Sequence, residues 1–136
     1  MLRHYFAAWG AQRVLLIGYS FGADVLPFVV NRLPPDLRAR VASVSLLGID
    51  AHASFEVHVS EWVDSDDGGP PTRPELAELR DLPVLCIYGE GETDSICPEL
   101  PPGMVSRQQV GKGHHFSGEY ALLADRILGF TRAHTP

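Results

Sequence analysis

Residues 14–26 have the sequence VLLIGYSFGADVL, in which an apolar run leads directly into a serine. This serine, Ser20, has one glycine two positions before it, Gly18, and another two positions after it, Gly22. The pattern Gly-x-Ser-x-Gly between a strand and a helix makes a tight turn that holds the serine at a strained backbone position. We expect both glycines to leave room for the strand and the helix to approach. The stretch therefore predicts either an exposed serine nucleophile or a tight turn that happens to contain serine.

The composition is that of an ordinary globular protein. The chain has 136 residues, of which 45% are hydrophobic and 21% are charged, and this length suffices for one domain with a real core. We expect a single domain over residues 1–136. With 17 acidic and 11 basic residues the formal net charge is −6, which argues against a nucleic-acid role, since that role needs a basic face. No apolar run approaches the ~20 residues of a membrane-spanning helix.

Strand-like and helix-like patterns alternate along the chain. The expected strands cover residues 13–18, 41–48, 83–89 and 104–110, and the expected helices cover residues 2–9, 21–33 and 118–132. Strands that alternate with helices form a parallel sheet whose two faces are both covered by helices. The sequence therefore predicts the α/β class.

The segment between the second and third expected strands departs from this alternation. Residues 53–63 alternate apolar and polar side chains, which predicts a half-exposed strand or an extended excursion. Residues 64–71 are rich in aspartate, glycine and proline but lack the ligand spacing of a calcium loop, so we interpret them as a solvated loop. Thr72, with Glu75 three residues later, predicts a capping box at the start of a short helix.

Side chains that could activate Ser20 follow the last two expected strands. A serine hydroxyl is a weak nucleophile that needs a base within hydrogen-bond reach and a third group that orients the base. Residues 89–95, GEGETDS, follow the third strand, and residues 111–118, GKGHHFSG, follow the fourth. The order serine, acid, histidine, with each group at the carboxyl end of a later strand, is that of the α/β-hydrolases. The sequence therefore predicts an α/β-hydrolase-like sheet with a catalytic triad.

The acid has to be chosen among three carboxylates. We choose Asp94, because a short carboxylate on the far side of a glycine-rich turn can reach back toward a histidine. Glu92 is the main rival. Asp50, directly after the second expected strand, is a more distant one.

The base is chosen between two adjacent histidines. We choose His114, because it directly follows Gly113, and we expect its neighbour His115 to pack with Phe116 against the start of the last helix. The backbone N–H of Phe21, the residue after the nucleophile, is the expected oxyanion donor. Further ligands for a metal site are missing beside the histidines, and we expect no cofactor.

The chain contains two cysteines, Cys86 and Cys97. Cys86 lies in the third expected strand, and Cys97 follows the polar loop after it. A disulfide, which would indicate an oxidising compartment, and two buried free thiols are equally compatible with these positions.

Four runs carry a more specific resemblance, namely LIGYSFGADVLPF (16–28), FEVHVSEW (55–62), PVLCIYGEGETDSICP (83–98) and GKGHHFSGEYALLADRIL (111–128). Together they resemble the bacterial virulence protein VirJ / AcvB family over nearly the whole chain. The resemblance implies an α/β-hydrolase fold, export to the periplasm and serine-hydrolase chemistry. Members of that family are associated with hydrolysis of aminoacylated phosphatidylglycerol, notably the lysyl form, so a small-molecule or lipid ester is the implied substrate, with contact to lipid head groups.

The resemblance also assigns roles to individual residues. It places the nucleophile on Ser20, the acid on Asp94 and the base on His114. The two cysteines match family positions as well, which implies a disulfide between Cys86 and Cys97.

The beginning of the chain departs from the family pattern. An α/β-hydrolase domain has several strands and an oxyanion loop before its elbow strand, whereas only a short helix precedes residues 13–18 here. We therefore expect that strand to lie at an edge of the sheet and the second oxyanion donor to be missing. The chain is then interpreted as the carboxyl half of a hydrolase domain. The alternative function is a non-catalytic binding or partner protein that keeps the hydrolase scaffold.

Overall fold

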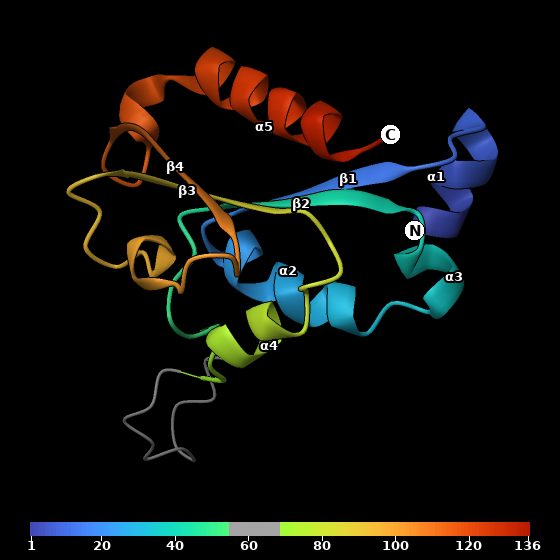
Figure 1. The fold of residues 1–136 in the computed structure, drawn as a ribbon, viewed down its shortest axis with the longest axis horizontal. Helices are drawn as coiled ribbons and strands as arrows, with labels where there is room; N and C mark the ends of the chain where they lie inside the picture. The colour runs from blue at the N-terminus through green and yellow to red at the C-terminus, as the bar shows by residue number, and fades with distance from the viewer. Residues whose placement is uncertain (55–68) are drawn as a thin grey trace.

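The structure is a computed structural model that describes residues 1–54 and 69–136. Within these residues a parallel sheet runs through the middle of the molecule, with its strands in the order β1-β2-β3-β4 (Figure 1). The strands are β1 (Val14–Tyr19), β2 (Val41–Leu47), β3 (Val84–Glu90) and β4 (Ser106–Lys112). The α/β class and the parallel sheet predicted from the alternating pattern are both confirmed.

Helices cover both faces of this sheet. Helix α5 (Tyr120–His134) lies on one face, whereas α2 (Phe21–Asn31) and α4 (Arg73–Ala77) lie on the other (Figure 1). Two further helices, α1 (Leu2–Trp9) and α3 (Pro35–Arg38), lie near the amino ends of β1 and β2 (Figure 1). Short 3-10 helices follow β3 and β4, at η1 (Cys97–Glu99) and η2 (Phe116–Gly118). In the described part of the chain, no helix is long and apolar enough to cross a bilayer.

Two apolar clusters attach the helices to the sheet. The cluster on the α2 and α4 side includes Ala23, Val30, Val44, Leu46 and Leu76. The cluster on the α5 side includes Leu85, Ile87, Phe116, Leu123 and Ile127. Strand β2 is buried at every position, because it is central and covered on both faces. Each fully buried valine, leucine, isoleucine or phenylalanine side chain contributes roughly 1.5–3 kcal/mol to the stability of the fold relative to an exposed one.

Strand β1 lies at an edge of the sheet within the described residues, as expected. Val14, its first residue, and Ser20, the residue directly after it, donate their N–H groups to backbone carbonyls on the β2 side. Because alternate residues of a strand turn their backbone groups to opposite sides, those of Leu15, Ile17 and Tyr19 point away from β2. Ile17 is 53% exposed. Among the described residues, no further strand covers the outer edge of this apolar strand.

The expectations for the segment between β2 and β3 have mixed outcomes. Most of residues 53–63 and 64–71 lies outside the described residues. The predicted capping box is wrong, because the backbone of Thr72 has helical angles and its hydroxyl donates to the carbonyl of Asp50 at 2.6 Å. Glu75 accepts a hydrogen bond from Asn31 of α2 at 2.7 Å. The side chains of Thr72 and Glu75 therefore form hydrogen bonds with residues distant in sequence and do not cap α4.

Candidate active site

Ser20 occupies the turn between β1 and α2 at the carboxyl end of the strand. Its backbone angles, φ 56° and ψ −124°, are ones that residues with side chains rarely adopt. A Cβ added to Gly18 would lie 2.5 Å from the carbonyl oxygen of Gly22, so glycine is required there for the strand and helix to approach. A Cβ added to Gly22 would meet no described atom within 4 Å. The expectation that both glycines provide room therefore holds for Gly18 alone.

His114 and Glu92 complete a chain of hydrogen bonds that begins at Ser20. The Ser20 hydroxyl lies 2.8 Å from Nε2 of His114, and Nδ1 of His114 lies 2.6 Å from Oε1 of Glu92. An ionised carboxylate only accepts hydrogen bonds, so Nδ1 carries the ring proton and Nε2 is left to accept from the Ser20 hydroxyl. The other oxygen of Glu92 accepts the N–H of Gly89 at 2.9 Å, and the Glu92 side chain is only 4% exposed. The carboxylate is thus held on both oxygens.

The structure does not bring Asp94, the residue expected to be the acid, to His114. Asp94 is exposed, and within the described residues no hydrogen bond joins it to His114, whose Nδ1 is engaged by Glu92. The turn after β3 explains the difference, because the N–H of Glu92 donates back to the carbonyl of Gly89 at 3.2 Å. This turn folds Glu92 over the end of β3, and the chain then leads away to a bridge between Ser95 and Asp50.

His115 also differs from expectation. Phe116 is buried in the cluster beneath α5, as anticipated, but His115 is exposed. Nδ1 of His115 lies 2.9 Å from the hydroxyl oxygen of Tyr19, at the end of β1. Of the two histidines, His114 is the one that contacts Ser20.

Glycines bring the three loops of the site close together. The N–H of Gly113 donates to the carbonyl of Glu90 at 2.9 Å, and a Cβ on Gly89 would overlap the Gly113 backbone. Gly48 follows β2 with φ +70°, and a Cβ there would lie 2.8 Å from both Oε1 of Glu92 and Cε1 of His114. Gly48 was not among the predicted site residues. Its signal in the sequence was a glycine that ends the second expected strand, residues 41–48.

A pocket of about 440 Å³ opens beside the nucleophile and is lined by Ser20, Phe21, Asp24, Asp50 and Ser54. Asp24, in the first turn of α2, is 8% exposed and accepts the backbone N–H of Asp50 at 2.8 Å. Burial raises the pKa of Asp24 to about 6, and this effect outweighs the lowering by the hydrogen bond from Asp50. Among the described residues, no salt bridge neutralises Asp24. The pocket therefore presents acidic groups next to Ser20.

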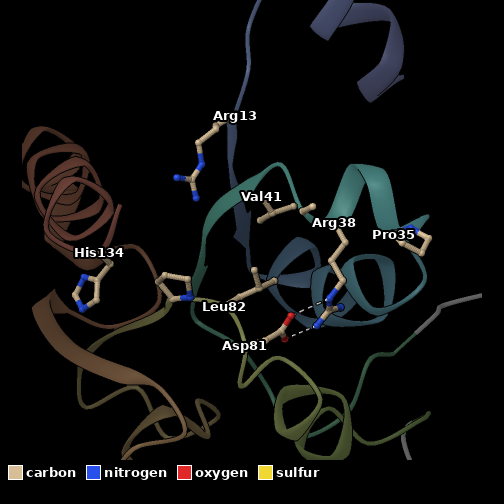
Figure 2. A pocket seen from close by; sticks show the side chains of 9 residues that line it. Arg13, Pro35, Arg38, Val41, Asp81, Leu82 and His134 are labelled. Carbon is tan, nitrogen blue, oxygen red and sulfur yellow. Dashed lines mark hydrogen bonds and ion pairs between the residues drawn. The ribbon is translucent and has the colours of Figure 1, made fainter. Parts of the chain in front are cut away.

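A second pocket, of about 530 Å³, lies at the opposite end of the strands (Figure 2). It is lined by Arg13, which precedes β1, by Val41, the first residue of β2, and by His134. Within it, Arg38 forms a salt bridge with Asp81 at 2.6 Å. Because Ser20, Glu92 and His114 all follow the carboxyl ends of their strands, this pocket is separate from the candidate active site.

A disulfide closes the loop that carries Glu92. Cys86 of β3 and Cys97 of η1 are bonded, with Cα atoms 5.9 Å apart and both side chains fully buried. The pairing implied by the family resemblance is therefore confirmed. Within the described residues, no group of three or more His, Cys, Asp or Glu side chains could hold a metal ion.

The parallel sheet, the elbow at Ser20 and the histidine loop together define the α/β-hydrolase fold. The sequence matches the family described as "Bacterial virulence protein (VirJ)" over residues 1–135, and the chain belongs to this family. Its structure is similar to the crystal structure of carboxylesterase CesB (YbfK) from Bacillus subtilis, with a TM-score of 0.58 and 19% sequence identity. The match covers 95% of this chain and 63% of that one, so the chain spans less than two thirds of the carboxylesterase. No curated protein matches the sequence.

Proposed function

We propose that Ser20, His114 and Glu92 form the catalytic triad of a serine ester hydrolase. The observation that carries the proposal is the continuous chain of hydrogen bonds from the Ser20 hydroxyl through His114 to Glu92. Ser20 attacks the ester carbonyl while its proton passes to Nε2 of His114, and Glu92 stabilises the imidazolium that forms. His114 then returns the proton to the leaving alcohol. Water, activated by His114 in the same way, attacks the acyl-enzyme and releases the acid.

The oxyanion that forms during attack needs hydrogen-bond donors close to Ser20. Phe21 directly follows Ser20 as the first residue of α2, and we assign its backbone N–H as one donor. The partial positive charge at the amino end of this helix adds to the stabilisation of the oxyanion. Ser20 itself is positioned by its N–H, which donates to the carbonyl of Leu47 at 2.9 Å.

Labelling with a fluorophosphonate probe tests whether Ser20 is an activated nucleophile. We expect stoichiometric labelling of the wild-type protein and none of Ser20→Ala. The matched control is Ser106→Ala, which removes an exposed hydroxyl at the start of β4 and should label like the wild type. Absence of labelling in well-folded wild-type protein would instead support a binding or partner protein that keeps the hydrolase scaffold.

The identity of the acid is tested by comparing Glu92→Gln with Asp94→Asn. Glu92→Gln keeps the shape of the side chain but no longer enforces the tautomer that leaves Nε2 free to accept the serine proton. By analogy with serine proteases we expect a loss of about 10⁴-fold in kcat. Asp94→Asn changes an exposed carboxylate and should leave kcat near the wild-type value. If Asp94→Asn lowered kcat more than Glu92→Gln, Asp94 would be the acid of the triad.

The pocket supports an ester whose acyl group carries a positive charge. Asp24 is buried in the lining beside Ser20 and forms no salt bridge within the described residues, and Asp50 adds a second carboxylate to the same lining. A cationic side chain in the substrate would supply the missing partner. Together with the family resemblance, this supports an aminoacyl ester, such as lysyl-phosphatidylglycerol, as the substrate.

The lysyl and norleucyl esters of glycerol separate charge recognition from ester hydrolysis, because the two acyl chains are similar in shape and differ in charge. We expect Asp24→Asn to lower kcat/KM for the lysyl ester by about 30-fold or more, the cost of losing a buried charge pair, and to leave the norleucyl ester nearly unaffected. Asp125→Asn, on the exposed surface of α5, is the matched control. Equal effects of Asp24→Asn on both esters would exclude charge recognition by Asp24.

The same proposal includes a periplasmic location and contact with lipid head groups. A buried disulfide is a feature of proteins from oxidising compartments, and the family resemblance implies export. Fractionation of cells that express the full-length protein tests the location. Recovery in the cytoplasmic fraction with alkylatable Cys86 and Cys97 would contradict it.

A further inference from the structure

The loop that carries His114 has a strained backbone. Four of the six residues from Gly113 to Gly118 have positive φ, and two of these, Phe116 and Ser117, are not glycine. Such angles cost free energy in residues with a side chain and persist only where surrounding contacts enforce them. The second half of the loop has such contacts, because Phe116 is buried and the Ser117 hydroxyl accepts the N–H of Lys112 at 2.9 Å. His114 and His115 precede this anchor.

Tyr19 contacts this first half of the loop from the end of β1. Its hydroxyl donates to the carbonyl oxygen of His114 at 3.1 Å. The Tyr19 hydroxyl oxygen also lies 2.9 Å from Nδ1 of His115. With its single proton directed at the carbonyl, the hydroxyl accepts the Nδ1–H of His115. The Tyr19 ring also stacks on the His114 ring, with centroids 5.3 Å apart and an interplanar angle of 27°. Two successive residues of the loop are thus fixed by one side chain.

We propose that Tyr19 is a positioning residue that, together with His115, sets the distance between the nucleophile and the base; this inference rests on the function proposed above. Tyr19 is joined directly to Ser20 by a peptide bond, so the strand end that places the nucleophile also restrains the loop of His114. The His114 side chain is 40% exposed, and the stacked ring limits its rotation toward solvent. A base displaced by about 1 Å can lose about 100-fold in rate.

Four variants separate the contributions of the ring, the hydroxyl and His115. Tyr19→Phe keeps the stacked ring and removes both hydrogen bonds, so we expect kcat for a glycerol ester to fall about fivefold to tenfold with KM unchanged. Tyr19→Leu also removes the ring, and we expect a fall of about 50-fold to 100-fold. His115→Leu should resemble Tyr19→Phe. Tyr5→Phe, on the exposed surface of α1, is the matched control and should leave kcat unchanged.

A double-mutant cycle tests whether Tyr19 and His115 act through one contact. If they do, Tyr19→Phe combined with His115→Leu lowers kcat no further than Tyr19→Phe alone. Independent effects, in which the two fold-losses multiply, would overturn the shared contact. Unchanged kcat in Tyr19→Phe and in Tyr19→Leu would overturn the positioning role altogether.

NMR of the ¹⁵N-labelled imidazole of His114 provides a readout that does not depend on turnover. In the wild type we expect one tautomer with the proton on Nδ1, and in Tyr19→Leu a broadened or mixed-tautomer signal. If the wild type hydrolyses no ester and the signal still changes in Tyr19→Leu, the positioning role stands and the proposed function fails. If esters are hydrolysed and neither the signal nor kcat responds to Tyr19→Leu, the positioning role fails and the proposed function stands.

Discussion

Gly48 shows how a single missing side chain shapes the site. Its N–H donates to the carbonyl of Ile87 at 2.9 Å, which fixes the end of β2 against β3. Its α-carbon then faces the contact between His114 and Glu92, where a Cβ would lie 2.8 Å from an atom of each. A glycine at this position therefore allows the acid and the base to meet.

We expect Gly48→Ala to lower kcat by about 100-fold, because the added methyl group displaces His114 or Glu92 from their contact. Gly91→Ala is the matched control, since Gly91 has a similar φ of +75° but no described atom within 4 Å of an added Cβ. Both variants carry the same backbone cost of about 1–2 kcal/mol in unfolding free energy. Esterase kinetics and thermal unfolding distinguish the two effects. An equal loss of kcat in both variants would show that backbone strain alone is responsible.

Asp24 is expected to make stability depend on pH. Burial raises the pKa of Asp24 from an ordinary value of 3.8 to about 6. The folded protein therefore binds this proton more tightly than the unfolded chain, and ionisation destabilises the fold as pH rises from about 4 through 6. Asp24→Asn cannot ionise, and its amide oxygen can still accept the N–H of Asp50. We expect it to melt near the wild-type temperature at pH 4 and above that temperature at pH 7–8.

Thermal unfolding of both proteins between pH 4 and pH 8 measures this difference. A melting-temperature difference that stays constant with pH would contradict the assignment. Together with the expected loss of lysyl-ester hydrolysis, greater stability of Asp24→Asn at neutral pH would mark Asp24 as a residue that serves function at a cost in stability.

At the scale of the elements, the contact between β1 and α2 determines how Ser20 is presented. The two elements approach so closely that backbone atoms of Gly22 and Ala23 lie within 2.8 Å of the position that a Gly18 Cβ would occupy. Backbone atoms cannot move aside as the end of a flexible side chain can. The elbow therefore depends on Gly18 for its packing and on the strained backbone of Ser20 for its direction.

We expect Gly18→Ala to lower the free energy of unfolding by about 3 kcal/mol, because the methyl group forces the strand and helix apart. Gly22→Ala is the matched substitution within the same motif. It adds a methyl group that meets no described atom, and alanine favours a helix over glycine by about 1 kcal/mol, so stability should be unchanged or slightly higher. Urea unfolding measures both variants. A larger loss of unfolding free energy in Gly22→Ala than in Gly18→Ala would contradict the role of Gly18 in the packing of the elbow.

At the scale of the whole molecule, β1 and α2 present an apolar border. Ile17 of β1 is 53% exposed and Phe21 of α2 is 50% exposed, and within the described residues no strand pairs with the outer edge of β1. An open, apolar edge strand pairs readily with other chains.

We therefore expect residues 1–136, expressed alone, to associate with increasing concentration. Ile17→Lys places a charge on the open edge and should shift the population toward monomer. Leu128→Lys, which changes an exposed leucine on α5, is the matched control and should not. Sedimentation at several concentrations measures the association. A monodisperse wild-type monomer would contradict this expectation.

The strands, the main helices, Ser20 and the histidine loop could all be predicted because each depends on a local pattern. Apolar runs of strand length indicate buried strands, and the spacing of Gly18, Ser20 and Gly22 indicates the elbow, whatever the rest of the chain does. The order of the loops along the sequence then placed Ser20 and His114 at one end of a parallel sheet, since parallel strands align their carboxyl ends.

The choice between Glu92 and Asp94 could not be made in this way. It depends on the path of the turn after β3, where the N–H of Glu92 bonds back to Gly89 and aims the longer side chain at His114. The roles of Gly48 and Tyr19 likewise arise only when loops distant in sequence pack against one another. Hydrogen bonds and steric contacts act over a few ångströms in space. These distances cannot be deduced from how far apart two residues lie in the sequence.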